Sequence, residues 1–462
     1  MVEWSDHSAT DHGGWLVPKA ATFGGKKKKG WNLKSVADTQ QAIDALARRI
    51  QALPGEIRWV YAQQDVIAAT AKGVSVTPGV QTARIDWFLR LAARVGLDVV
   101  AAKLASLVLL VAICCRQSRI TVKSGRRRYF VGISALKEMK LIPQFEAMSG
   151  GPATVVDQRF SSALASIYPP SAAELLRSWR DAAQPVFADL AADKRGLLDR
   201  SAILTYVVRR LHHYAHFLAV FRGLNAAEPG AAVAFSAADL PAYAAVRAGI
   251  EAIYFPHGFQ TRSLVFPDFH RVVAFNAPEA EHVQSRLPHT PVSMPPPDIR
   301  PIRVARRVAV VGNYGDKLAR SQELIEFCRA AGIDVVVRPH PADRSGYWNE
   351  WEDTSGVRID RGGTFDEFLE RHRPSVMATW YSTPVYDAIV RGVMPVSLEA
   401  DQPDIVFPFA DVALSWPEQK ERIQAVLAND KVRYDALIKA LKLAVGPQHA
   451  DDAIRKFGSV VI

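Results

Sequence analysis

Four short sequences combine residue types that suit the binding of a phosphate group, and each comes directly after an apolar run. Gly312 and Gly315 in the first allow backbone N–H groups to approach an anion closely. The pair Ser382–Thr383 in another stands where a predicted strand is followed by a predicted helix, and the first turn of a helix has free N–H donors. Arg338 adds a fixed positive charge, and His340, two residues later, adds a ring N–H. The sequences are Gly312–Asp316, Arg338–Pro341, Trp380–Pro384 and His257–Gly258.

These residues also have simpler interpretations. Taken alone, Ser382 and Thr383 are typical of a helix cap, and Arg-Pro-His-Pro is typical of a rigid loop with a packed histidine. We favour phosphate binding because three of the loops lie in the same half of the chain and all of them follow strands. The predicted anion-binding residues are Gly312, Asn313, Arg338, Ser382 and Thr383, together with His340.

His257 has two interpretations. Its side chain either points into a cleft and touches a ligand, or holds its own loop by bonding to the backbone. We favour the cleft because Gly258 follows at once and allows close approach.

The elements that position these loops alternate between strand and helix. Strand, helix, strand with short connections is the unit of a parallel α/β sheet, in which ligands bind beyond the carboxyl ends of the strands. The pattern predicts strands over 231–235, 250–255, 308–311, 333–337, 375–378 and 393–398, with helices over 242–247, 319–331, 384–391 and 417–444.

The first 230 residues have a weaker pattern. An amphipathic helix begins near Val36, strand-like runs cover 57–61 and 129–133, and residues 171–222 are predicted to be helical. His212 and His216 share a face of that last helical stretch, as metal-binding pairs do. The glutamate of a catalytic HExxH motif is replaced by His213, so we favour helix packing over zinc.

The composition is that of a folded protein with two domains: 462 residues, 49% hydrophobic and 23% charged. A proline-rich stretch from Pro291 to Pro301 is the best linker. It separates a segment over 35–295 from one over 302–446. A flexible basic leader over 1–34 and a tail over 447–462 complete the predicted organisation.

The formal charge of +10 favours an acidic partner, and the basic residues are partly local, over 116–128. No nucleic-acid-binding motif accompanies them, so we expect no nucleic acid. Three cysteines without a pairing pattern favour the cytoplasm. The apolar segment Ala101–Cys115 is shorter than the roughly 20 residues needed to span a bilayer. A buried helix or strand is favoured there, and peripheral membrane contact is the second interpretation.

The Pro-His-Gly sequence, the Arg-Pro-His-Pro loop and the Ser-Thr pair resemble motifs of bacterial GT-B glycosyltransferases that use CMP-activated sugars. These include sialyltransferases, capsule polysialyltransferases and Kdo transferases, with their HP and S-S/T motifs. The resemblance covers about 231–398. It implies an α/β GT-B-like fold in which two Rossmann-like domains face a cleft, with acceptor binding in 35–295 and nucleotide-sugar binding in 302–446.

The resemblance also implies roles for single residues. The histidine of the HP motif matches His340, which would contact the donor phosphate and act as its general acid. The Ser-Thr pair would bind the same phosphate. In the family an acidic residue of the N-terminal domain is the catalytic base, and here Asp239 is our choice, although it is equally typical of a helix cap. Asp157 and Asp268 are weaker candidates.

The expected activity is inverting transfer of sialic acid or Kdo from a CMP-sugar to a polysaccharide or glycolipid acceptor, at the inner face of the cell membrane. No Asp-x-Asp pair is present to hold a divalent ion against a diphosphate, so we expect no metal and no cofactor besides the donor. The alternatives are a donor linked to UDP or CDP, or a non-catalytic protein of polysaccharide assembly.

Overall fold

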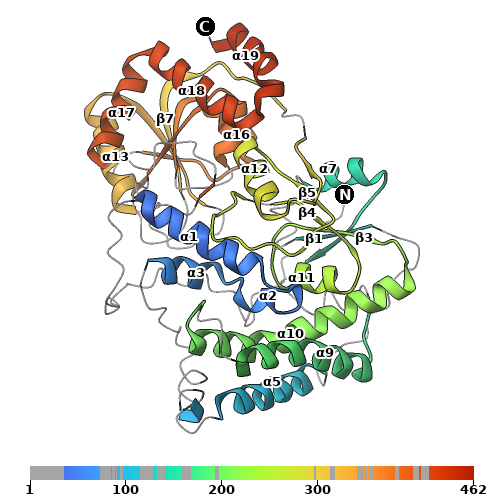
Figure 1. Ribbon diagram of the computed structural model, residues 1–462. Helices are drawn as coiled ribbons and strands as arrows, with labels where there is room; N and C mark the ends of the chain where they lie inside the picture. The colour runs from blue at the N-terminus through green and yellow to red at the C-terminus, as the bar shows by residue number, and fades with distance from the viewer. Residues whose placement is uncertain are drawn as a thin grey trace.

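The computed structural model describes residues 36–72, 85, 89, 91–93, 97–114, 128–132, 141–157, 168–192, 197–256, 258–295, 298–312, 318–340, 348, 351–352, 357–379, 384–398, 405–406 and 416–461. Within these ranges the chain forms two parallel β-sheets flanked by helices, one in each half of the sequence (Figure 1). The α/β class predicted from the sequence is confirmed.

The first sheet has the strand order β2-β1-β3-β4-β5-β6, and all of its neighbouring strands are parallel. The chain passes from β1 to β2 on one side and then from β3 to β6 on the other, so the order reverses between β1 and β3. Such a reversal is where ligands bind in open α/β sheets. The strands are β1 (Arg128–Gly132), β2 (Thr154–Asp157), β3 (Ala232–Phe235), β4 (Glu251–Tyr254), β5 (Arg271–Val273) and β6 (Val292–Ser293).

The second sheet has the order β11-β10-β7-β8-β9, again all parallel. The strand that comes first along the chain, β7, lies in the centre of this sheet, with β8 on one side and β10 on the other. This is the arrangement of a Rossmann half-domain. The order therefore reverses between β7 and β10. The strands are β7 (Ala305–Val311), β8 (Asp334–Arg338), β9 (Arg358–Ile359), β10 (Pro374–Thr379) and β11 (Met394–Ser397).

Helices of the first half cover the first sheet and add a further layer beyond it. The helix α10 is buried over most of its surface because α5 and α9 pack on one side and α11 on the other (Figure 1). Asp199 begins α10 by accepting hydrogen bonds from the N–H groups of Ser201 and Ala202. The helices are α1 (Val36–Gln51), α2 (Gly55–Tyr61), α3 (Gln64–Ala71), α5 (Asp98–Cys114), α7 (Ile142–Ser149), α9 (Ala172–Ala192), α10 (Arg200–Ala227), α11 (Leu240–Arg247) and α12 (Ala277–Arg286).

Helices of the second half enclose the second sheet. A capping box of Thr364 and Glu367 begins α15, and Gly332, at φ 65°, follows α13 in a left-handed conformation that glycine adopts readily. The helices are α13 (Leu318–Ala330), α15 (Phe365–His372), α16 (Pro384–Val390), α17 (Trp416–Ala428), α18 (Asp430–Val445) and α19 (Pro447–Val461).

Two segments have a structure that differs from the one predicted from the sequence. The run Ile57–Tyr61, expected to be strand-like, is the buried helix α2; the expectation was wrong because a short apolar run fits either element. Residues 447–462, expected as a tail, form α19 up to Val461, and Ala450, Ala453 and Phe457 lie in the core of the second half.

The two halves touch beside the carboxyl ends of the first sheet. The Val406 N–H donates to the Gln260 carbonyl at 3.0 Å, and Thr261 pairs with Ile405 in an antiparallel bridge. The rings of Phe275 and Tyr386 lie 6.2 Å apart between centroids. The loop after β4 is thus part of the boundary between the halves.

Candidate functional site

Three of the four predicted loops start from adjacent strands. In the register of the second sheet, Val311 at the end of β7 stands between Arg338 at the end of β8 and Thr379 at the end of β10. The Gly312 N–H donates to the Arg338 carbonyl at 3.0 Å, and the Thr379 hydroxyl donates to the Val311 carbonyl at 3.0 Å. The strand ends that carry the loops are therefore held together at the reversal in strand order.

Gly312 contributes space at this edge. The Gly312 N–H already donates to the Arg338 carbonyl. What Gly312 provides for an anion is therefore space, because it has no side chain. A Cβ at this position would meet only the Trp348 ring and the Arg338 carbonyl, at 3.9 and 4.0 Å. The buried indole of Trp348 is thus the side chain nearest to a Cβ at position 312.

Arg338 is turned toward the loop that precedes α15. Its guanidinium donates to the carbonyls of Gly362 and Gly363 at 3.0 and 2.6 Å and lies 5.2 Å from the centre of the Phe368 ring. The side chain is buried. These contacts fix the loop, and binding of a phosphate by Arg338 stays a prediction.

His340 follows β8 by two residues and is partly exposed, which agrees with a place at the edge of the sheet. Four other predicted site residues lie outside the described residues: His257, Asn313, Ser382 and Thr383. Residues 380–383 begin directly after Thr379, which is bonded to Val311, so the chain enters the Ser-Thr loop at the predicted edge.

Asp239 lies at the carboxyl end of the first sheet, at the N-cap position of α11, but its side chain makes no capping hydrogen bond. Its charge acts on Tyr206 and Arg210 of α10 and on Tyr254 at the end of β4. Burial, opposed by Arg210, raises the pKa of Tyr206 to about 12. Asp239 therefore sits in a cluster of hydroxyl and guanidinium groups that the sequence did not indicate.

The two weaker candidates for a base have different surroundings. Asp268 lies in the loop between β4 and β5 and forms an ion pair with Arg58 of α2 at 2.6 Å, and Arg58 also donates to the Phe266 carbonyl of that loop. Asp157 ends β2 opposite Gly132 of β1. Of the three, Asp239 follows the strand β3 at the reversal in strand order of the first sheet, and its charge acts on Tyr206 and Arg210 of α10.

Glu279 on α12 is a buried carboxyl group that sequence reasoning missed. Its Oε1 accepts a hydrogen bond from the Gln260 N–H at 2.9 Å, and Asn276 caps the helix beside it. Burial raises the pKa of Glu279 to about 7, although the Gln260 backbone and Asn276 favour the charged form. Its charge also acts on Tyr254 and on Tyr386 of the second half.

The loop between β4 and β5, which contains His257, is held from several elements. Gln51 of α1 exchanges two hydrogen bonds with the backbone of Phe266, at 3.0 and 2.8 Å. The Tyr243 hydroxyl donates to the Val265 carbonyl at 2.8 Å, and Arg286 donates to the Arg262 carbonyl at 3.0 Å. The loop that borders the second half is therefore firmly positioned.

The histidine cluster of α10 is a packed one. His212 and His213 lie 4.2 Å apart between ring centroids, and His213 stacks near Phe217. Burial, aided by nearby cations, lowers the pKa of His212 to about 4 and that of His213 to about 3. Neutral rings among apolar side chains are what helix packing requires.

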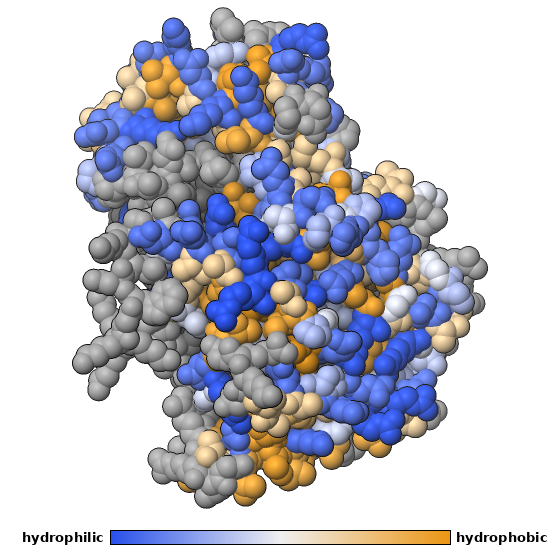
Figure 2. Space-filling model, in the orientation of Figure 1, coloured by the Kyte–Doolittle hydropathy of each residue, from blue (hydrophilic) through white to orange (hydrophobic). Residues whose placement is uncertain are grey.

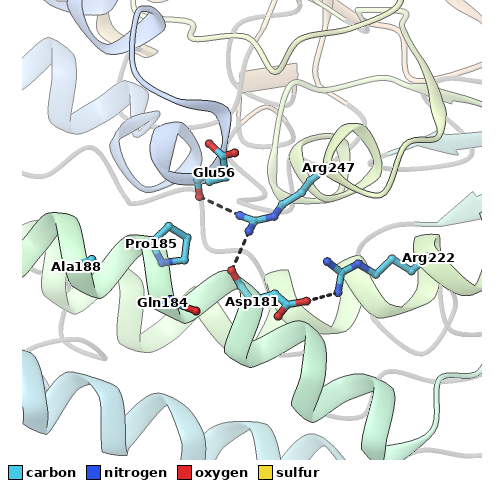
Figure 3. A pocket seen from close by; sticks show the side chains of 7 residues that line it. All are labelled: Glu56, Asp181, Gln184, Pro185, Ala188, Arg222 and Arg247. Carbon is cyan, nitrogen blue, oxygen red and sulfur yellow. Dashed lines mark hydrogen bonds and ion pairs between the residues drawn. The ribbon is translucent and has the colours of Figure 1, made fainter.

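A separate hollow of about 530 Å³ lies between α2, α9, α10 and α11 (Figure 3). Arg222 pairs with Asp181 across it at 2.8 Å, and Arg247 donates to the Asp181 and Glu56 carbonyls. Because Arg247 ends α11, which leads back to the start of β4, this hollow lies toward the amino ends of the strands. The predicted loops are at the other edge.

No family model and no curated protein matches this chain. Among solved structures it is similar to "UDP-GlcNAc 2-epimerase from Methanocaldococcus jannaschii", with a TM-score of 0.35 and 10% sequence identity over 72% of this chain and 99% of that one. A similarity this low shows neither the fold nor the function of this chain.

Proposed function

We propose that this chain is a glycosyltransferase that binds a nucleotide-linked sugar by its phosphate at the carboxyl edge of the second sheet. One observation carries the proposal: the strands β10, β7 and β8 are neighbours, and the loops with Gly312, His340 and the Ser-Thr pair all leave from their carboxyl ends. Ligands of open parallel sheets bind at such an edge, where the strand order reverses.

In the proposed reaction an acceptor hydroxyl attacks the anomeric carbon of the donor sugar. Asp239 takes the proton of that hydroxyl, and the bond between the sugar and the nucleotide phosphate breaks. His340 donates a proton or a hydrogen bond to the leaving phosphate, and the hydroxyls of Ser382 and Thr383 stabilise its charge. A single displacement of this kind inverts the anomeric centre.

The donor class is the finer part of the proposal. A CMP-linked sialic acid or Kdo is supported by the sequence resemblance in the HP and Ser-Thr motifs. An anionic or lipid-linked glycan acceptor, handled at the cytoplasmic face of the cell membrane, is supported by the net charge of +10. A UDP- or CDP-linked donor would use the same edge of the sheet.

Thermal unfolding in the presence of CMP, CDP and UDP tests the donor class, because a ligand that binds only the folded state stabilises it. We expect CMP to raise the melting temperature most. A larger shift with UDP or CDP would replace the CMP assignment and keep the site. No shift with any of the three would contradict nucleotide binding.

Donor hydrolysis tests the catalytic role of His340. We expect the wild type to release CMP slowly from CMP-sialic acid or CMP-Kdo, and His340→Ala to lower that rate by about 100-fold, the usual contribution of a general acid. His289→Ala is the matched control, because His289 is exposed on a turn between α12 and β6. Equal rates in wild type and His340→Ala would remove His340 from the mechanism.

A further inference from the structure

The helix α5 has an apolar face that no described part of the chain covers. Its inner face packs against α9 and α10 and buries Ala102 and Leu110. Its outer face presents large apolar side chains with helical spacing. These are Leu97, just before the helix, Val100, Leu104 and Val108, with 53, 53, 60 and 68% of their surface exposed.

The exposed side chains form one surface at the edge of the molecule. In Figure 1, α5 lies in the outermost helical layer of the first half, away from the second sheet, and Figure 2 shows an orange patch at the same place. A contiguous apolar patch of this kind on a folded protein marks an interaction surface. Among the described helices, none is long and apolar enough to cross a bilayer.

Among the described side chains of α5, the exposed charge is positive. Lys103 is exposed beside Leu104. The only carboxylate of the helix, Asp98, is buried and pairs with Arg200 at 3.0 Å, so it presents little negative charge. The sequence from Val99 to Lys137 contains eight lysines and arginines and no acidic residue.

We propose that the outer face of α5 binds the surface of an anionic membrane, with the helix lying along the bilayer. Apolar side chains next to lysine are the features by which an interfacial helix enters the boundary between headgroups and acyl chains. A second copy of the chain fits less well, because a two-fold interface would bring the exposed Lys103 of both copies to the same apolar contact. This inference does not depend on the proposed function.

Flotation of the full chain with lipid vesicles tests the proposal. We expect binding to vesicles of phosphatidylcholine with phosphatidylglycerol, weaker binding in high salt, and little binding to phosphatidylcholine alone. The double variant Leu104→Glu with Val108→Glu should lower the partition coefficient at least about tenfold, because two apolar groups no longer enter the interface. Lys103→Gln should lower it about fivefold.

Val432→Glu is the matched control, since Val432 is 41% exposed on α18 in the other half of the chain, and its binding should equal that of the wild type. Circular dichroism and the melting temperature without ligand establish that each variant is folded. If the double variant does not fold, Lys103→Gln still tests the proposal.

Three results would overturn the proposal: no binding of the wild type to anionic vesicles, equal binding of wild type and double variant, or equal binding to neutral vesicles. Sedimentation equilibrium covers the remaining alternative. A wild-type dimer that Leu104→Glu with Val108→Glu dissociates, without vesicle binding, would assign the face to self-association. A failure here leaves nucleotide binding untouched, because that is measured separately.

Discussion

Glu279 shows at the residue scale how burial makes one carboxyl group sensitive to pH. Its pKa is raised to about 7, above the ordinary 4.5, so the folded state holds a proton that the unfolded state has released between these values. Stability should therefore fall as pH rises through this window, by an amount on the order of 3 kcal/mol in total.

The variant Glu279→Gln tests this reasoning. Glutamine keeps an oxygen that accepts the Gln260 N–H but carries no charge, so the variant should be at least as stable as the wild type at pH 8. Urea denaturation across the window measures the difference. If the variant loses stability at every pH by the same amount, the carboxyl group acts only through packing.

Arg338 illustrates a residue whose contacts support a loop. Replacement by lysine removes the planar fork that reaches both Gly362 and Gly363, and weakens the contact with Phe368. We expect Arg338→Lys to lower the free energy of unfolding by about 1–2 kcal/mol. Urea denaturation measures the loss, and an unchanged midpoint would mean that the loop before α15 does not need the guanidinium.

At the scale of elements, the sequence predicted the strands best where a long apolar run ends in glycine, proline or a polar loop, as in β7, β8 and β10. Short strands such as β5, β6 and β9 carry too few residues for their periodicity to be recognised. Glu279 was missed because its helix has the composition of a surface helix. Only the tertiary packing of the loop after β4 buries its polar face.

Gly312→Ala tests whether the end of β7 forms part of a ligand site. A Cβ there meets nothing closer than 3.9 Å, and its φ is not in the left-handed region, so stability should stay the same within about 0.5 kcal/mol. If a nucleotide phosphate approaches the backbone here, the added methyl group should weaken its affinity about tenfold or more.

Titration calorimetry with the nucleotide that best protects the wild type measures this effect. Gly362→Ala is the matched control, because a Cβ there meets only Asp360, at 3.5 Å, in the loop before α15. Equal affinities in Gly312→Ala and wild type would place the ligand away from the end of β7.

At the scale of the whole molecule, buried histidines dominate the expected response to acid. Burial lowers the pKa of His212 to about 4 and that of His213 to about 3. Burial, together with the nearby charge of Arg286, also lowers the pKa of His282 to about 3. Each ring stays neutral in the folded state while the unfolded chain binds a proton near pH 6.5. Stability should thus fall as pH drops below about 6.5, and Glu279 opposes this only in part.

The free energy of unfolding should fall by about 2 kcal/mol per pH unit between pH 6 and 5. Three histidines lower it as the pH drops, and one carboxyl group, Glu279, raises it. Urea midpoints at several pH values measure the slope. His282→Gln should flatten this slope by about half, because it removes one of a net two protons, whereas His289→Gln, at an exposed position, should leave it unchanged. A wild-type slope near zero would mean that these rings bind protons in the folded state, which would place water or an acidic partner beside α10 and α12.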